Sequence, residues 1–157
     1  MFFSKKITIL RTQKRKDDSI PTFKLQTNGL MKKTEFKIEY QLKTASVNIL
    51  WNSISTPLGL AEWFADGVTV NDTEYVFCWE KNEQTAYLIN TKPNVSARFQ
   101  WEDDLNTDYY FELKIDALEV TGEMALIITD FAEKGEKEDL TLLWNKQIET
   151  LRRKTGI

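Results

Sequence analysis

The 157-residue sequence contains no histidine. This absence excludes Ser-His-Asp and Cys-His catalysis, histidine metal sites and pH sensing by an imidazole. Cysteine is almost as scarce: Cys78 is the only one, so neither an intramolecular disulfide nor a thiolate cluster can form. Cys78 lies in the apolar run 75–79, where we interpret it as a packing thiol rather than a nucleophile. A chain with one cysteine fits a reducing, cytoplasmic setting.

Long apolar runs are missing as well. None approaches the ~20 residues that a membrane-spanning helix needs, and the run 7–10 is too short for the core of a secretory signal. We therefore expect no insertion into a membrane. With 41% apolar and 29% charged residues, the composition is that of a globular protein, and the length suits one domain with one core.

Charge is distributed unevenly along the chain. Residues 1–30 carry seven basic and two acidic side chains, a balance of +5, whereas the rest carries 14 basic and 22 acidic side chains, a balance of −8. A basic segment can contact nucleic acid, but this one lacks glycine- or arginine-rich repeats and regularly spaced aromatic residues. We therefore predict a poorly ordered extension over 1–30, a folded domain over 31–157 and no nucleic-acid binding. Because Met31 stands just before the first regular strand, a second hypothesis places residues 1–30 upstream of the natural start.

The first half of the folded part predicts a strand and two helices. Residues 35–43 alternate between apolar and polar side chains, which is typical of a half-buried strand. Two short helices are expected within 46–66. Thr56 can cap the second of them, with Pro57 at its first position, where a missing amide proton costs nothing. Gly67 is expected to end that helix, because glycine tolerates positive φ.

The remaining sequence predicts a series of strands and one long helix. Short segments with apolar side chains on one face are separated by polar turns, which is typical of an antiparallel sheet. We expect these strands at 68–71, 74–80, 85–92, 95–102, 108–118 and 122–132. Over residues 136–154 apolar side chains recur every three or four positions, which predicts a helix.

Acidic residues cluster before the predicted strand 108–118. Clustered carboxylates can bind Ca²⁺ or act as acid and base. The spacing lacks the Asp-x-Asp-x-Asp-Gly pattern of a calcium loop, so we predict a solvated turn without a metal. The set comprises Glu102, Asp103, Asp104 and Asp108. Residues 133–139 are likewise predicted to be a solvated loop that enters the last helix.

Two aromatic residues, Trp63 and Phe64, stand side by side in the second predicted helix. Adjacent helical residues point about 100° apart, so both rings cannot face the interior equally. We expect Phe64 to point inward. For Trp63 we favour structural packing; the alternatives are that it covers the sheet edge or the mouth of a pocket, or that it helps form a protein interface.

The order of strand, two helices, six strands and long C-terminal helix resembles the helix-grip fold of the START-like (SRPBCC) superfamily. Residues 56–66 resemble the stretch after the first helix in relatives of the activator of the heat-shock-protein-90 ATPase. Residues 125–132 and the Leu-Trp-x-x-Gln-Ile-x-x-Leu pattern of 143–151 are similar to segments of small uncharacterised bacterial START-like proteins. The resemblance implies an α+β domain in which a curved antiparallel sheet of six to seven strands wraps around the C-terminal helix.

The resemblance also implies a ligand cavity between the sheet and the last helix. Residues on the apolar faces of the predicted elements would line it. These are Phe64, Phe77, Trp79, Phe99, Trp101, Phe111, Leu113, Leu140 and Trp144. The alternative is a filled core, because the same side chains would pack a small domain without leaving a void.

These features favour a non-catalytic domain that binds a small hydrophobic ligand, lipid-like or aromatic, or a partner protein. One alternative is an enzyme of the polyketide cyclase type, against which the missing histidines and the lack of converging polar residues count. Another is a co-chaperone-like ATPase activator, although the activators in that family use a further N-terminal domain with no counterpart in these residues. We assign no catalytic residue, metal or cofactor, and the oligomeric state stays open.

Overall fold

The computed structural model describes residues 32–42 and 46–157, so the predicted extension over 1–30 and the boundary at residue 31 lie outside the described residues. Within these described residues, seven antiparallel strands form one sheet, together with three α-helices and a short 3₁₀ helix. In chain order these elements are β1 (Lys33–Leu42), α3 (Val47–Ser55), α4 (Pro57–Trp63), β2 (Gly67–Asn71), β3 (Glu74–Trp79), β4 (Asn82–Lys92), β5 (Ser96–Trp101), η2 (Glu102–Asp104), β6 (Phe111–Ala117), β7 (Met124–Glu133) and α5 (Lys137–Thr155). The predicted α+β helix-grip architecture is confirmed.

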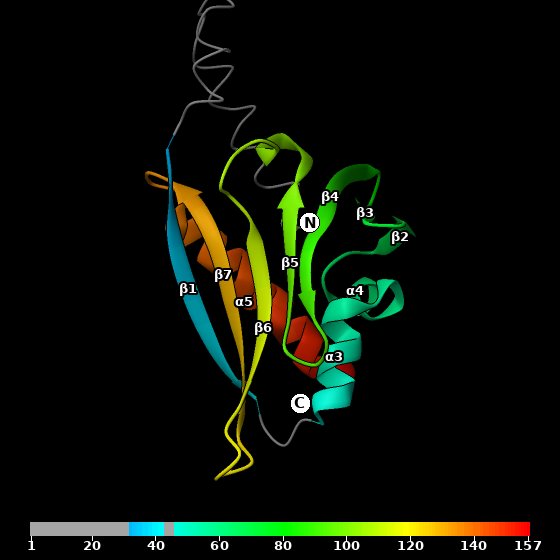
Figure 1. Ribbon diagram of the computed structural model, residues 1–157, viewed down its shortest axis with the longest axis vertical. Helices are drawn as coiled ribbons and strands as arrows, with labels where there is room; N and C mark the ends of the chain where they lie inside the picture. The colour runs from blue at the N-terminus through cyan, green and yellow to red at the C-terminus, as the bar shows by residue number, and fades with distance from the viewer. Residues whose placement is uncertain (1–31, 43–45) are drawn as a thin grey trace, which may run out of the picture.

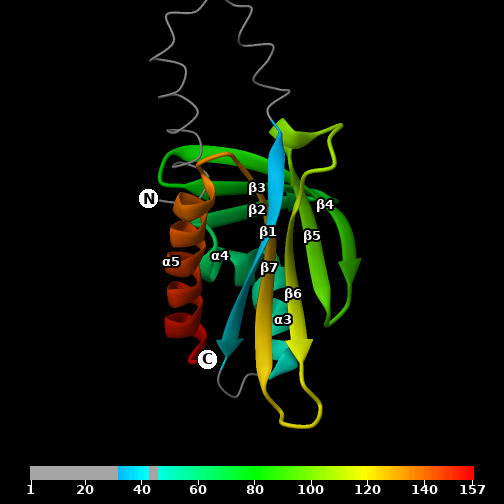
Figure 2. The ribbon, with the colours of Figure 1, turned by 90° about the vertical axis from the view of Figure 1, so that its left-hand side faces the viewer.

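The sheet has the strand order β1-β7-β6-β5-β4-β3-β2, so the first and last strands of the chain lie side by side. The segment with α3 and α4 carries the chain from the β1 edge to the β2 edge (Figure 1). The sheet is curved, and α5 lies across its concave face (Figure 2). The concave face and α5 therefore enclose the core.

Two hydrogen bonds tie α5 to the edge strand β1. The Tyr40 hydroxyl donates to Asn145 Oδ1 over 2.6 Å, and Arg152 Nη2 donates to the carbonyl of Gln41 over 2.8 Å. On β1 itself Phe36 and Leu42 are buried, while Glu35 and Lys37 are exposed, as the alternation of the sequence predicts. The edge strand β1 is thus part of the curved sheet that wraps around α5.

The junction between the two short helices follows its sequence signals. Thr56 Oγ1 accepts a hydrogen bond from the amide of Gly59 over 3.0 Å, and Pro57 is the first residue of α4. The prediction for Gly67 was wrong. The helix ends at Trp63, residues 64–66 connect it to the sheet, and Gly67 begins β2 opposite Cys78 instead of adopting positive φ.

Candidate functional site

The nine residues predicted to line the interior are all buried and belong to one core cluster. Phe64 lies at its centre. Its ring stacks on Trp144 at a centroid distance of 5.8 Å and meets Phe77 edge-on at 4.9 Å. The Phe64 carbonyl also accepts hydrogen bonds from Trp79 Nε1 and Gln147 Nε2, over 2.8 and 3.0 Å. The interior is therefore an aromatic assembly that joins α4, the sheet and α5.

Trp63 is buried as well, with only 3% of its surface exposed. Its indole Nε1 donates to the carbonyl of Ser53 on α3 over 2.8 Å. The burial agrees with the favoured expectation of structural packing and not with a pocket mouth or an interface, because α3 folds back over α4 and covers this ring. Leu58, on the same helix, is 84% exposed instead.

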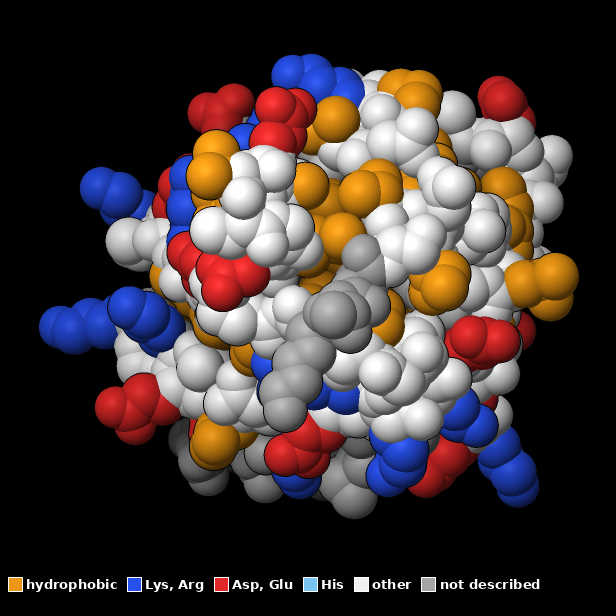
Figure 3. All heavy atoms as spheres, turned by 90° about the horizontal axis from the view of Figure 1, so that it is seen from below, with side chains coloured by type: hydrophobic (Ala, Val, Ile, Leu, Met, Phe, Trp, Pro, Cys, Tyr) orange, Lys and Arg blue, Asp and Glu red, His pale blue; other side chains and the backbone are white. Residues whose placement is uncertain are grey.

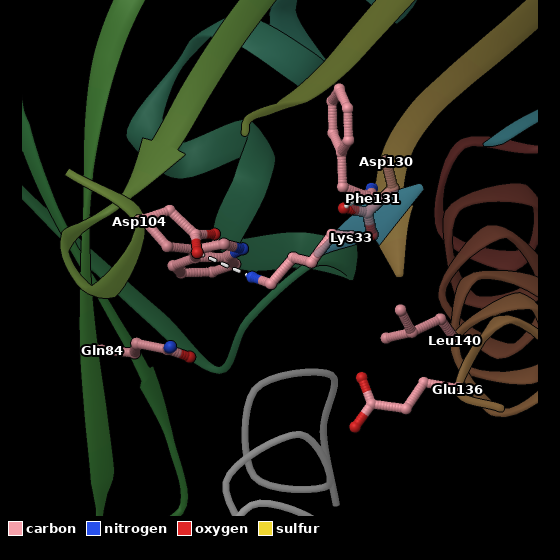
Figure 4. Close-up of a pocket in the computed structure, with 8 residues that line it drawn as sticks. Lys33, Gln84, Asp104, Asp130, Phe131, Glu136 and Leu140 are labelled. Carbon is pink, nitrogen blue, oxygen red and sulfur yellow. Dashed lines mark hydrogen bonds and ion pairs between the residues drawn. The ribbon is translucent and has the colours of Figure 1, made fainter. Parts of the chain in front are cut away.

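A narrow polar pocket of about 20 Å³ adjoins this aromatic interior. Trp101 and Leu140 line both the pocket and the predicted cavity. We call "polar pocket" the space lined by Lys33, Gln84, Trp101, Asp104, Asp130, Phe131, Glu136 and Leu140. Figure 4 shows Gln84 on β4 facing Glu136 and Leu140, which point toward it from the other side.

Asp130 is one of two buried carboxylates in the lining of the polar pocket. Its Oδ2 accepts a hydrogen bond from Trp144 Nε1 over 2.9 Å, and its Oδ1 accepts one from the amide of Phe131 over 2.8 Å. Burial raises the pKa of Asp130 to about 7, although these hydrogen bonds and the charge of Lys33 favour the ionised form. The pKa of Asp130 therefore lies in the range in which histidine side chains usually titrate, and the sequence contains no histidine.

A buried ion pair forms the upper side of the polar pocket, where Lys33 Nζ lies 2.6 Å from Asp104 Oδ1 (Figure 4). The backbone amide of Lys33 also donates to the Tyr109 hydroxyl over 3.0 Å. The prediction of a solvated turn was wrong for Asp104, because the 3₁₀ helix η2 turns this side chain toward β1. The other members of the acidic set, Glu102, Asp103 and Asp108, are exposed.

Gln84 contributes an acceptor without a donor. Its Oε1 is shielded from solvent and has no hydrogen-bond partner within the described part of the chain. Such atoms are rare in folded proteins, because leaving one unsatisfied costs roughly 1–3 kcal/mol. Gln84 Oε1 is thus able to accept a hydrogen bond from a donor in the polar pocket.

These polar residues differ in how far the sequence could reveal them. Asp130 follows Leu126 and Ile128 on the inward phase of β7, so a polar residue in an apolar alternation was a readable signal. Lys33 and Gln84 carry no such signal, because each looks like an ordinary surface residue of its strand. Glu136 was expected in a solvated loop, yet it lines the polar pocket.

Apolar side chains also gather on the end of the molecule seen from below (Figure 3). The exposed large apolar residues of α3, β4 and the two hairpin turns at this end are Ile49, Ile89, Val95, Leu118 and Val120. We call this surface the apolar end.

Two kinds of site are absent from the described residues. Within 32–42 and 46–157, no group of three or more Cys, Asp or Glu side chains is placed to hold a metal ion. In the same ranges, no helix is both long and apolar enough to cross a membrane.

Comparisons with known proteins agree with this architecture. The family model of the START-like superfamily domain matches residues 30–157. A Bacteroides fragilis protein solved by NMR is 44% identical, with a TM-score of 0.59 over 78% of this chain and 91% of that one. A comparison with the curated proteins gives no match.

Two further solved structures share the fold at low identity. The Aha1 dimer from Colwellia psychrerythraea is 12% identical, with a TM-score of 0.57 over 75% of this chain and 90% of that one. DynU16, a protein in the dynemicin biosynthetic locus, is 13% identical, with a TM-score of 0.61 over 76% of this chain and 46% of that one.

Proposed function

The chain belongs to the START-like superfamily, and on this premise we propose that its domain binds a small, largely apolar molecule without transforming it. The observation that carries the proposal is the junction of the polar pocket with the aromatic interior at Trp101 and Leu140. Ligand sites usually combine apolar walls with a few placed polar groups. The apolar portion of the ligand would push aside the aromatic rings around Phe64. Its polar end would enter the polar pocket.

The experiment is native mass spectrometry of the purified protein, followed by titration with apolar fluorescent probes and a panel of lipids and aromatic compounds. Leu140→Trp would fill the junction and is expected to abolish binding. Leu142→Trp is the matched control, because Leu142 lies on the same helix and is 55% exposed. Equal binding by both variants, or no binding of any compound by the wild type, would contradict the proposal.

A second candidate is an enzyme of the polyketide cyclase type, and Asp130 is the observation that favours it. A buried carboxyl with a pKa near 7 can serve as a general acid or base. Against this candidate, Asp130 already accepts hydrogen bonds on both oxygens. Turnover of a polyketide-type substrate that Asp130→Asn abolishes, without loss of substrate binding, would establish the enzyme.

Binding of a partner protein is a third candidate, which the apolar end favours because large exposed apolar surfaces mark interaction sites. A co-chaperone-like activator would use such a surface. Val120→Asp would weaken the complex, whereas the exposed Val70→Asp, on β2, would serve as the control. Stimulation of a heat-shock-protein-90 ATPase that is lost in Val120→Asp would establish this role.

A further inference from the structure

We propose that the open edge of β1 binds the same edge of a second copy of this chain, so that the two sheets join across a two-fold axis. The inference goes beyond the proposed ligand binding and does not depend on it. It follows from the length of this edge, from the regularity of the strand and from the order of its charges. Because it concerns the outer edge of the sheet and not its interior, either proposal can fail without the other.

The strand β1 has an open side. All 10 of its residues pair with β7 in one continuous register, and within the described residues no strand pairs with its other side. Figure 2 looks onto this side, where β1 lies in front of β7 and α5 lies to the left. The backbone amides and carbonyls along such an edge are a template for a further strand.

The edge lacks most of the devices that prevent pairing. Proteins protect open edges with proline, with bulges or with very short strands. None of these is present in Lys33–Leu42. The edge at the other end of the sheet differs, because β2 is only 5 residues long and none of them is charged. Charged side chains also discourage pairing, and on β1 their effect depends on the partner.

The charges on β1 alternate in sign. Glu35, Lys37 and Glu39 share one face of the strand and are exposed. With Glu35 or Lys37 at the two-fold axis, an antiparallel copy of the strand would place like charges opposite each other. With Phe36 at the axis, Glu35 of each copy lies opposite Lys37 of the other, so two ion pairs form. The sequence of β1 thus disfavours some self-pairings and favours this one.

A second register also places opposite charges together. It has Ile38 at the axis and sets Lys37 opposite Glu39 of the other copy. This register extends the pairing to Gln41, whose carbonyl already accepts a hydrogen bond from Arg152 Nη2 over 2.8 Å. The register with Phe36 at the axis ends before this contact and leaves it intact, so we assign that register.

This complementarity favours a second copy over an unrelated strand. An unrelated strand would need the same alternation of signs in the reverse direction, whereas every copy of this chain carries it. The side chains are available, because Lys37 and Glu35 keep 62% and 46% of their surface exposed. In a two-fold pair each contact occurs twice, so that one substitution changes two contacts at once.

The experiment measures self-association of the full chain by sedimentation velocity, over a roughly hundredfold range of protein concentration. The wild type should form a dimer and no larger species, because the pairing uses the open β1 edge of both copies. Lys37→Glu and Glu35→Lys should each raise the dissociation constant of the dimer about tenfold or more, because like charges then lie opposite each other. Lys114→Glu is the matched control, since it makes the same charge change at an exposed position of the internal strand β6 and should leave the constant unchanged.

Combining the two reversals tests the register. The double variant Glu35→Lys, Lys37→Glu exchanges the two charges, so it should dimerise like the wild type if Phe36 lies at the axis. With Ile38 at the axis, the double variant would instead place two carboxylates opposite each other. A mixture of the two single variants should form a heterodimer, because the basic edge of one then faces the acidic edge of the other. Circular dichroism checks that each variant is folded.

Several results would overturn the inference. One is a wild type that stays monomeric at every concentration, and another is a dimer that neither reversal weakens. A dimer that is lost in both single variants and regained in neither the double variant nor the mixture also contradicts the pairing. Hydrogen exchange adds a further test: protection of the outer β1 amides that does not change with protein concentration would show that another part of the same chain covers this edge. None of these results bears on ligand binding, which Leu140→Trp tests separately.

Discussion

Asp130 on β7 and Trp144 on α5 join the sheet to the C-terminal helix by a buried hydrogen bond of 2.9 Å from Trp144 Nε1 to Asp130 Oδ2. Trp144 also stacks on Phe64, so this one contact connects the polar pocket to the centre of the aromatic interior. A polar group that links both regions makes their stability depend on the protonation of Asp130.

The stability of the protein should depend on pH through Asp130. Its pKa is raised from 3.8 to about 7 on folding, so the folded state holds a proton that the unfolded chain has released over this range. The free energy of unfolding therefore falls as pH rises from about 4 to about 7, because the unfolded state binds fewer protons. Asp130→Asn cannot ionise and lacks this contribution. Urea denaturation from pH 4.5 to 8 should show its stability relative to wild type increasing with pH, and parallel curves would contradict the assignment.

The contact between α3 and α4 should require glycine at position 59. A Cβ atom there would lie 2.7 Å from the Asn52 carbonyl carbon and 2.8 Å from Ser53 Cα, both of which are backbone atoms that cannot move alone. We expect Gly59→Ala to force the helices apart and to cost about 1–3 kcal/mol in thermal or urea unfolding. Gly67→Ala is the control, since its Cβ would meet only Cys78 Cβ at 3.8 Å. Equal stability of the two variants would show that the helices adjust.

Phe64 should be a principal stabilising residue of the core. Its ring is fully buried and contacts rings on α4, on the sheet and on α5, among them Phe77 and Trp144. Phe64→Ala should lower the free energy of unfolding by about 3–5 kcal/mol. Leu58→Ala, in the helix that Phe64 caps but exposed, should change it by no more than about 0.5 kcal/mol. A loss below about 1 kcal/mol for Phe64→Ala would mean that the neighbouring rings refill its place.

The buried ion pair of Lys33 and Asp104 should be costly to break from one side. Both side chains are nearly excluded from solvent, at 12% and 10% exposure. Lys33→Met leaves the Asp104 carboxylate buried without its partner, which costs about 3–5 kcal/mol. The double variant Lys33→Met, Asp104→Leu should recover most of this loss. As a control, Lys37→Met breaks a solvent-exposed pair and should lower the free energy of unfolding by no more than about 1 kcal/mol. If Lys33→Met lowers it by no more than this, the pair of Lys33 and Asp104 does not carry the expected stability.

The fold was largely readable from local patterns. The alternation in β1, the Thr56-Pro57 start of α4 and the helical spacing of Leu140 and Leu143 are set by neighbours in the sequence, and the structure has elements at those places. The errors lie where tertiary contacts override a local rule. Gly67 looks like the end of a helix, but its pairing with Cys78 places it in a strand.

The candidate site was much less readable. Lys33 and Asp104 are 71 residues apart, and no local sequence pattern near either residue predicts that they form an ion pair. Gln84 resembles a surface residue of a strand. Trp63 points away from the apolar face that contains Phe64, and its burial depends on the packing of α3 against α4. Asp130 alone broke a local pattern, because it occupies an inward position of an apolar strand.

By itself, the sequence determined the order of the elements, the faces they bury and the resemblance to START-like proteins, because these depend on spacings of two to four residues along the chain. Only the tertiary structure decided where charge enters the interior. The order of strands in the sheet and its curvature around α5 bring β1, β4, η2 and the start of α5 to one end of the core. The polar pocket exists because side chains from those separate segments converge there, and such convergence is a property of the folded chain alone.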